Sequence, residues 1–238
     1  MNPLEAPSAL PPQGSAASGP AKPEPRRPLA SDGSSGAGSA TTACADRNAD
    51  AHLVEVPVRT ETVFEGRFLQ VRRDIVRLPD GHETHREFIV HPGAVAVVPL
   101  LDDGRLVMVR QYRYPLQRVL LEFPAGKLDP GEGPFATGQR ELAEETGYTA
   151  REWARAGVLH NAAAYSDESI EIWFARGLEA GAQRLDHGEF IKVVPMGADE
   201  LDALAARGEL TDAKTLIGLL WLQRWRAGAW PLQWRPAP

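Results

Sequence analysis

Three glutamates near the middle of the chain have the types and the spacing needed to hold a hard metal ion. Glu141, Glu144 and Glu145 stand in the run "RELAEETGY", and on a helix residues three and four positions apart share one side. Carboxylates crowded in this way repel one another mildly. A divalent ion such as Mg²⁺, which takes oxygen ligands, would relieve that repulsion. A solvated acidic helix face has the same pattern, so the spacing alone leaves both interpretations open.

The residues around these glutamates predict a helix from about Pro134 to Thr146. Pro134 suits the first turn, where its fixed φ is already helical and its missing N–H would have no helical partner. Gly147 is the expected end, because glycine adopts the left-handed conformation of a helix C-cap. Arg140 lies four residues before Glu144 and can form an ion pair with it.

The longer segment from Gly126 to Tyr148 resembles the Nudix box, G-x5-E-x7-R-E-U-x-E-E-x-G-U, in which U is aliphatic or bulky and apolar. Every specified position is filled, by Gly126, Glu132, Arg140, Glu141, Leu142, Glu144, Glu145, Gly147 and Tyr148. The resemblance implies an α/β (α+β sandwich) Nudix fold, with a mixed β-sheet packed between helices and an N-terminal antiparallel β region. It implies diphosphate hydrolysis assisted by more than one Mg²⁺, or Mn²⁺, ion. The implied metal ligands are the backbone carbonyl of Ala125 and the side chains of Glu141, Glu144 and Glu145, while Glu132 and Arg140 are expected to brace the loop and helix.

Motifs outside the box are similar to those of the ADP-ribose pyrophosphatase branch of the family. They are "HREFIVHPGAVAVVPL", "RQYRYP", "LLEFPAGKLDPGE" and "GELTDAKTLIGLLWL", and the resemblance runs from about Phe64 to Leu222. It implies hydrolysis of ADP-ribose to AMP and ribose 5-phosphate. Sugar-nucleotide pyrophosphatases share several of these motifs, so GDP-mannose, another nucleotide sugar or a dinucleotide stays open as the substrate. A non-catalytic domain that senses ADP-ribose is the third interpretation, and the intact box argues against it.

Three residues outside the helix are candidates for binding the substrate. The branch pattern suggests that Arg86 and Arg113 contact the diphosphate or the terminal ribose, and a guanidinium group can pair with phosphate oxygens through two hydrogen bonds. The alternative for each is a surface arginine or an interface ion pair. Glu122, just before the metal loop, either binds substrate or orients the loop.

Glu168 is the candidate for the residue that activates the attacking water. It lies in the run "NAAAYSDES", which resembles the S-P-G-x-S-x-E loop of ADP-ribose enzymes, where the glutamate takes a proton from the water or orients it. Ala163 and Ala164 replace the usual Pro and Gly, so the shape of this loop is expected to differ. Glu145 and Glu144 are the other candidates for this catalytic role.

The segments that must position these residues are mostly predicted strands. The run "LVEVPVRTETVFEGRFLQVRRDIVRL" is rich in β-branched residues, and Asp80-Gly81 and Asp103-Gly104 are hairpin signals between strand-like runs. "GAVAVVPLL" is apolar throughout and suits a strand that is buried on both faces. Further strands are expected at "WARAGVLH" and "IEIWFARGL". Two helices should follow, over "GADELDALAARGEL" and "DAKTLIGLLWLQRWRAG", with Thr211 as the N-cap of the second.

Composition predicts a tail rich in Pro, Ala, Gly and Ser at residues 1–50. The resemblance implies a Nudix domain at 51–230, which leaves a C-terminal tail at 231–238. The first tail has the composition of disordered segments and contains the one cysteine, Cys44, so no intramolecular disulfide can form. A lone cysteine and the lack of a long apolar run predict a cytoplasmic protein. The net charge of −6 argues against nucleic-acid and anionic-membrane partners. The expected partner is therefore a small nucleoside-diphosphate substrate, and the family resemblance implies a homodimer.

Overall fold

The first sheet of the protein is a three-stranded antiparallel meander, seen in a computed structural model that describes residues 49–237. A short 3-10 helix η1 (Ala51–Leu53) precedes strands β1 (Val56–Glu65), β2 (Gln70–Arg77) and β3 (Glu83–Val90). Gly81 in the β2–β3 turn has a φ of 89°, a conformation that glycine adopts without steric cost. The hairpin predicted at Asp80-Gly81 is therefore confirmed. Every residue of β1 is exposed.

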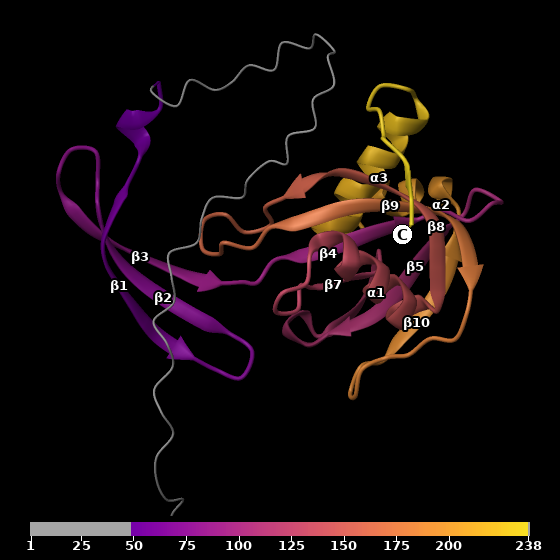
Figure 1. The fold of residues 1–238 in the computed structure, drawn as a ribbon, viewed down its shortest axis with the longest axis horizontal. Coiled ribbons are helices and arrows are strands. Elements are labelled where there is room, and N and C mark those ends of the chain that lie inside the picture. The colour runs from indigo at the N-terminus through magenta and orange to yellow at the C-terminus, as the bar shows by residue number, and fades with distance from the viewer. Residues whose placement is uncertain (1–48, 238) are drawn as a thin grey trace, which may run out of the picture. The chain divides into compact units, whose positions relative to one another are not determined.

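A five-stranded sheet forms the centre of the fold and has the order β11-β8-β9-β4-β7 (Figure 1). Its strands are β4 (Ala94–Pro99), β7 (Ala125–Lys127), β8 (Tyr148–Leu159), β9 (Ile170–Ala180) and β11 (Arg235–Pro236). Strand β4 is parallel to β9 and antiparallel to β7, so the sheet is mixed. All residues of β4 are buried, as its continuous apolar sequence predicts.

A second three-stranded sheet has the order β10-β5-β6. It contains β5 (Leu106–Arg113), β6 (Arg118–Glu122) and β10 (Ile191–Met196), with a 3-10 turn η2 (Tyr114–Leu116) between β5 and β6. The Asp103-Gly104 turn leads from β4 into β5, where Leu100 and Leu106 form an antiparallel bridge. The predicted turn is therefore present, but the strands that it joins belong to different sheets and pair only at this bridge.

The described part of the chain has three α-helices: α1 (Pro134–Thr146), α2 (Ala198–Ala206) and α3 (Ala213–Arg226). Helix α1 has the predicted bounds and ends at Gly147, whose φ of 77° is left-handed. The predicted N-cap of the last helix is wrong. Asp212 is the cap, and its side chain accepts a hydrogen bond from the Thr215 N–H, because the first helical residue is Ala213 and a cap must directly precede it.

Helices α1 and α3 pack on opposite faces of the central sheet (Figure 1). On one face Val95 and Val97 of β4 pack with Leu142 of α1, and on the other Val98 packs with Leu219 of α3. This alternation follows from the two-residue period of a strand. The predicted sandwich of a mixed sheet between helices is confirmed.

The segment after α3 returns to the central sheet. Arg235 and Pro236 pair with β8 as the edge strand β11, and the guanidinium group of Arg176 lies 4.1 Å from the centre of the Trp234 ring. These residues belong to the predicted C-terminal tail, whereas Cys44 and almost all of the predicted N-terminal tail lie outside the described residues.

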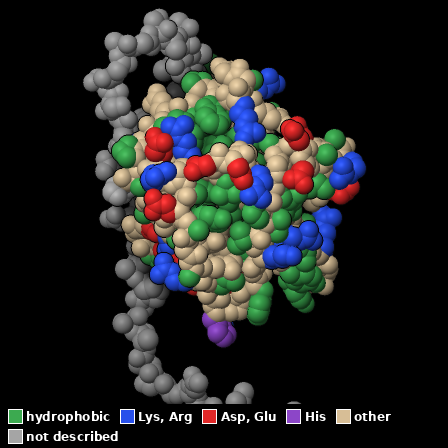
Figure 2. All heavy atoms as spheres, turned by 90° about the vertical axis from the view of Figure 1, so that its right-hand side faces the viewer, with side chains coloured by type: hydrophobic (Ala, Val, Ile, Leu, Met, Phe, Trp, Pro, Cys, Tyr) green, Lys and Arg blue, Asp and Glu red, His purple; other side chains and the backbone are tan. Residues whose placement is uncertain are grey.

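On the face of the domain that Figure 2 shows, basic and acidic side chains are intermixed around apolar ones. None of the helices in residues 49–237 is long and apolar enough to span a membrane.

Candidate active site

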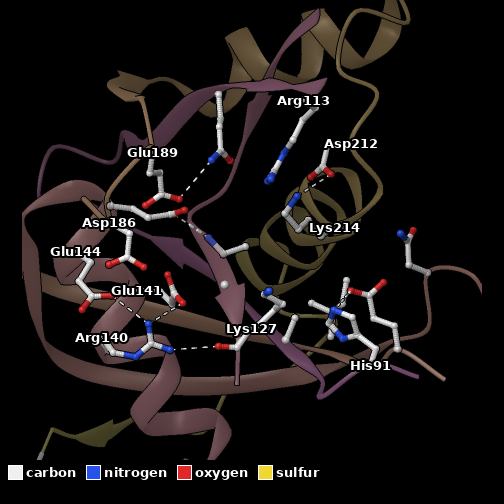
Figure 3. Close-up of a pocket in the computed structure, with 18 of the residues that line it drawn as sticks. His91, Arg113, Lys127, Arg140, Glu141, Glu144, Asp186, Glu189, Asp212 and Lys214 are labelled. Atoms are coloured by element: carbon white, nitrogen blue, oxygen red, sulfur yellow. Dashed lines mark hydrogen bonds and ion pairs between the residues drawn. The ribbon is translucent and has the colours of Figure 1, made fainter. Parts of the chain in front are cut away.

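A pocket of about 400 Å³ brings together residues from distant parts of the chain. One wall is acidic and is formed by α1 and by the connection between β9 and β10 (Figure 3). The other wall carries the cationic side chains Arg113, from the end of β5, and Lys214, from the first turn of α3. A pocket with walls of opposite charge can hold metal ions against one side and an anionic substrate against the other.

The acidic wall contains the three carboxylates predicted from spacing, and Glu141, Glu144 and Glu145 all line the pocket. Strand β7 places the metal loop against them. The Ala125 N–H donates to Glu145 Oε2 over 3.0 Å, and Gly126 lies against the carboxylate of Glu141. The predicted ligand set, three carboxylates and the region of the Ala125 carbonyl, is therefore gathered at one place.

Burial is the main electrostatic influence on these carboxylates. Burial raises the pKa of Glu145 to about 8, and the charges of Glu141 and Glu189 act in the same direction. The hydrogen bond from the Ala125 N–H acts to lower this pKa. Burial also raises the pKa of Glu141, against the opposing effect of Arg140. Raised pKa values show that negative charge is disfavoured here, and a bound divalent cation would offset that cost.

Arg140 is the cation that faces this wall. It donates to Glu141 over 2.8 Å, to Glu144 over 3.0 Å, to Glu132 over 2.9 Å and to the Lys127 carbonyl over 3.1 Å. The predicted bracing role of Glu132 and Arg140 is confirmed by these bonds, because together they tie the loop to the helix.

Among residues 49–237, no three His, Cys, Asp or Glu side chains already surround a common point as a finished metal cage. Glu141 and Glu144 both point to Arg140, and Glu145 points to the Ala125 N–H. The donors themselves are all oxygens, which is the set that Mg²⁺ and Mn²⁺ take. The residues present therefore fit such an ion once these side chains turn from their protein partners.

The cationic wall is organised around a buried carboxylate. Glu122 is 0% exposed and accepts from Arg113 Nε over 2.7 Å and from Arg113 Nη2 over 2.6 Å. Lys214 Nζ also donates to Glu122, and it donates to Asp212 over 2.8 Å. Burial acts to raise the pKa of Glu122, but the Arg113 hydrogen bonds and the Lys214 charge hold this pKa below its ordinary value. The carboxylate lies behind Arg113 and fixes the plane of its guanidinium group.

The structure does not bring Arg86 to this pocket. Arg86 lies on β3 with 46% of its side chain exposed, and its Nε donates to Glu55 over 2.9 Å. Of the two predicted substrate arginines, only Arg113 lines the pocket of the described chain.

Glu168 lines the pocket from the loop between β8 and β9. His91 Nδ1 accepts a hydrogen bond from the Gly93 N–H over 3.1 Å, so in a neutral ring the proton is on Nε2. That nitrogen lies 3.5 Å from Glu168 Oε1. The loop is also tied to β3 by a bridge between Ile89 and Ser166. Glu168 is thus held from two sides at the edge of the pocket.

Two carboxylates in the pocket escaped the sequence-based prediction. Asp186 and Glu189, from the connection between β9 and β10, lie with the α1 glutamates on the acidic wall (Figure 3). Gln111 Nε2 donates to Glu189 over 3.3 Å, and the Glu189 charge raises the pKa of both Glu141 and Glu145. The run "RLDHGEF" is the signal that was available, since it places acidic residues after the strand predicted at "IEIWFARGL".

Phe68 is a further pocket residue that sequence reasoning missed. It lies in the turn between β1 and β2, is 69% exposed, and has Lys127 Nζ 4.0 Å from its ring centre. Its ring offers an apolar surface at the edge of a charged pocket. Such a surface can stack on a planar group of a ligand.

Two family descriptions match adjoining parts of the chain. Residues 90–218 match the NUDIX domain family, and residues 57–89 match the nucleoside diphosphate sugar hydrolase N-terminal domain. The boundary lies next to His91, where the three-stranded N-terminal sheet ends and the central sheet begins.

Relatives match over most of their length. The "ADP-ribose pyrophosphatase" of Bacillus subtilis is 37% identical over 72% of this chain and 94% of that protein. The protein of the same name from Mycobacterium tuberculosis is 39% identical over 68% of this chain and 80% of its own length. The "methanol dehydrogenase activator" of Bacillus methanolicus is 38% identical over 71% and 92%. A solved structure titled "Crystal structure of ADP compounds hydrolase" superposes with a TM-score of 0.66, at 25% identity, over 73% of this chain and 95% of that one.

Proposed function

Since the chain belongs to the Nudix hydrolase family, we propose that it cleaves the diphosphate bond of ADP-ribose and releases AMP and ribose 5-phosphate. The observation that carries the proposal is the pocket with an acidic wall, formed by the intact Nudix box, facing Arg113 and Lys214 across a space of about 400 Å³. Relatives of 37% and 39% identity carry the name ADP-ribose pyrophosphatase, which supports this substrate over other nucleotide sugars.

The acidic wall would hold the metal ions. Glu141, Glu144 and Glu145, with the Ala125 carbonyl, supply oxygen ligands, and we propose Mg²⁺ as the natural ion, with Mn²⁺ as a substitute and more than one ion in each site. Such ions neutralise phosphate oxygens and make water a better nucleophile. In this scheme Arg140 would release Glu141 and Glu144 to bind metal and stay paired with Glu132 of the loop, to which its Nη2 donates over 2.9 Å.

Arg113 would hold the substrate from the opposite wall. Glu122 takes two of its five N–H donors, so the remaining donors can bind phosphate oxygens or the terminal ribose. Because Glu122 is behind the arginine and fully buried, its proposed role is to orient Arg113. Direct contact with the substrate is the alternative for Glu122.

The candidates for the general base are Glu168, Glu145 and Glu144, which the sequence suggests, and Glu189, which the pocket adds. Glu168 is held beside His91. Glu189 is a candidate from the structure, because it lies on the acidic wall beside the proposed metal ligands. Glu168→Gln, Glu189→Gln and Glu145→Gln should be compared with Glu179→Gln, which removes a carboxylate of 63% exposure at the far end of β9. Loss of the base should lower kcat by about 10²- to 10⁴-fold, and the control should keep wild-type kcat.

A homodimer would give Arg86 a substrate role that the described chain alone does not. The apolar side chains of Val56, Val58 and Phe64 on β1 are 53%, 46% and 54% exposed, and association with a second copy would cover them. Arg86 could then reach the pocket of the partner copy. Light scattering of the purified protein tests the dimer. If the contact exists, Arg86→Ala should raise KM while the protein stays dimeric.

A cytoplasmic location, without nucleic-acid or membrane partners, stays a prediction from composition.

The deciding experiment is hydrolysis of a small panel with Mg²⁺, Mn²⁺ or EDTA. The panel contains ADP-ribose, GDP-mannose, NADH and diadenosine polyphosphates, with the products separated by chromatography. Fastest turnover of ADP-ribose to AMP, and none in EDTA, is the expected result. Preference for another compound would overturn the substrate and keep the chemistry. Tight binding of ADP-ribose without turnover would instead favour a sensing domain.

A further inference from the structure

Lys214 is a partly buried lysine at the first turn of α3. Only 12% of its side chain is exposed, which is unusual because lysine side chains are rarely buried unless they are paired. Its Nζ donates to Glu122 and to Asp212, and the residue lines the pocket on the wall opposite α1 (Figure 3).

Neutralising Glu122 does not by itself account for this lysine. Arg113 already binds both oxygens of the Glu122 carboxylate, over 2.7 and 2.6 Å. An ammonium group has three donors, and two acceptors among the described residues leave one N–H for a ligand. The start of a helix adds partial positive charge at the same place. The wall therefore offers a second cation beside Arg113.

We propose that Lys214 binds a phosphate oxygen of the substrate on the side that faces away from the metal-binding carboxylates. This inference rests on the proposed function and adds a residue to it. A compact ammonium charge suits a single phosphate oxygen, while the guanidinium group of Arg113 suits a pair of oxygens. Held by Glu122 and Asp212, the lysine binds the diphosphate without first having to be ordered. Its contact exists in the bound substrate as well as in the transition state, so its loss should raise KM more than it lowers kcat.

Lys214→Gln and Lys214→Arg test the proposal against wild type. The measurements are kcat and KM for ADP-ribose with Mg²⁺, and the Kd, by calorimetry, of the ADP-ribose analogue in which a methylene group replaces the bridging oxygen of the diphosphate. We expect KM and Kd to rise at least about 10-fold in the glutamine variant, the size of effect that a lost charged hydrogen bond produces. We expect kcat to stay within about threefold. The arginine variant should recover part of the affinity, because it keeps the charge.

Arg118→Gln is the matched control. Arg118 donates to Thr211 Oγ1 over 3.0 Å, beside the start of the same helix, but it lines a separate hollow. Removal of this cation should leave KM and Kd unchanged. Thermal unfolding of all variants distinguishes a structural role from a binding role. A lower Tm in Lys214→Gln with an unchanged Kd would mean that the lysine only balances the charge of Glu122. That result would overturn the proposal.

Binding of pyrophosphate with Mg²⁺ separates this inference from the proposed function. If wild type binds pyrophosphate but does not hydrolyse ADP-ribose, the substrate assignment fails and Lys214 is still judged by the loss of pyrophosphate affinity in Lys214→Gln. An unchanged affinity overturns the role of the lysine whatever the substrate. A wild-type protein that neither binds pyrophosphate nor hydrolyses ADP-ribose overturns both.

Discussion

Gly126 and Glu141 approach so closely that a Cβ atom at Gly126 would occupy the space of the Glu141 carboxylate. The requirement for glycine here is one of space, since Gly126 is absent from the glycines with positive φ. The contact joins β7 to α1 at the point where the proposed metal ligands meet. It explains physically why the first position of the box is a glycine.

Gly126→Ala should therefore reduce activity much more than stability. The methyl group would push the flexible end of Glu141 aside, and a displacement of about 1 Å in a catalytic group can reduce the rate about 100-fold. We expect a loss of that size in kcat with Mg²⁺ and a nearly unchanged Tm. Gly133→Ala is the control, because nothing lies within 4 Å of a Cβ at that position. Full activity of Gly126→Ala would contradict this account.

The metal-free protein should lose stability as the pH rises from about 4.5 to about 8, in part because of Glu145. Burial raises its pKa from 4.5 to about 8, so the folded state holds this proton more tightly than the unfolded state. The stability is complete below the unfolded pKa and is lost as the pH rises through the folded one. Urea unfolding in EDTA should show a steeper decline for wild type than for Glu145→Gln, with a difference on the order of a few kcal/mol. Equal pH dependence of the unfolding free energy in the two proteins would contradict this role of Glu145.

Mg²⁺ should reverse this trend at the upper end of the same range. A cation binds the ionised carboxylates, so its affinity rises as Glu145 and Glu141 lose their protons. We expect added Mg²⁺ to raise Tm more at pH 8 than at pH 5, measured by thermal unfolding at a fixed ion concentration. The Glu145→Gln variant should show a smaller rise at pH 8. The same rise in both proteins would mean that Glu145 does not bind the ion.

The parts of the fold that local chemistry determines could be predicted from the sequence. Pro134 and Gly147 bound α1 through their own backbone preferences, and Gly81 and Gly104 mark turns in the same way. Strand β11 could not be predicted, because its two residues are held by pairing with β8 and not by any pattern of their own.

The site shows the same division between local and long-range information. Helical spacing alone brings Glu141, Glu144 and Glu145 to one side of α1. Asp186 and Glu189 reach that side only because their connection is bound to α1 through tertiary hydrogen bonds. Gln183 donates to the Glu145 carbonyl over 2.6 Å, and the Arg184 N–H donates to the Glu144 carbonyl over 2.9 Å. Lys214 likewise meets Glu122 from a position 92 residues away.

Glu122→Gln should destabilise the protein and weaken substrate binding together. The amide keeps the shape of the carboxylate but leaves Arg113 and Lys214 without the buried charge that they share. Removal of one partner from a buried ion pair costs about 3–5 kcal/mol, and an exposed pair such as Arg73–Glu87 should cost under about 1 kcal/mol. Urea unfolding of Glu122→Gln and Glu87→Gln makes this comparison. Similar losses in the two variants would show that the buried cluster is not stabilising.

Gly218→Ala tests the packing of α3 on the central sheet. A Cβ at Gly218 would lie 2.8 Å from Phe123 Cε2 and 3.0 Å from Val98 Cγ2, and both neighbours are fully buried. Alanine favours a helix by about 1 kcal/mol over glycine, whereas overpacking a core costs about 1–3 kcal/mol. We therefore expect a net loss of up to about 2 kcal/mol in urea unfolding.

The same substitution should also affect the site, because Phe123 adjoins Glu122 and its N–H donates to Thr215 Oγ1 over 3.0 Å. A shift of Phe123 would move the carboxylate that holds Arg113, and KM should rise with the loss of stability. Gly138→Ala is the matched helical control, since its Cβ would meet Val95 Cγ1 at 3.3 Å and requires only a small adjustment. A Gly218→Ala protein more stable than wild type would show that α3 can move away from the sheet without cost.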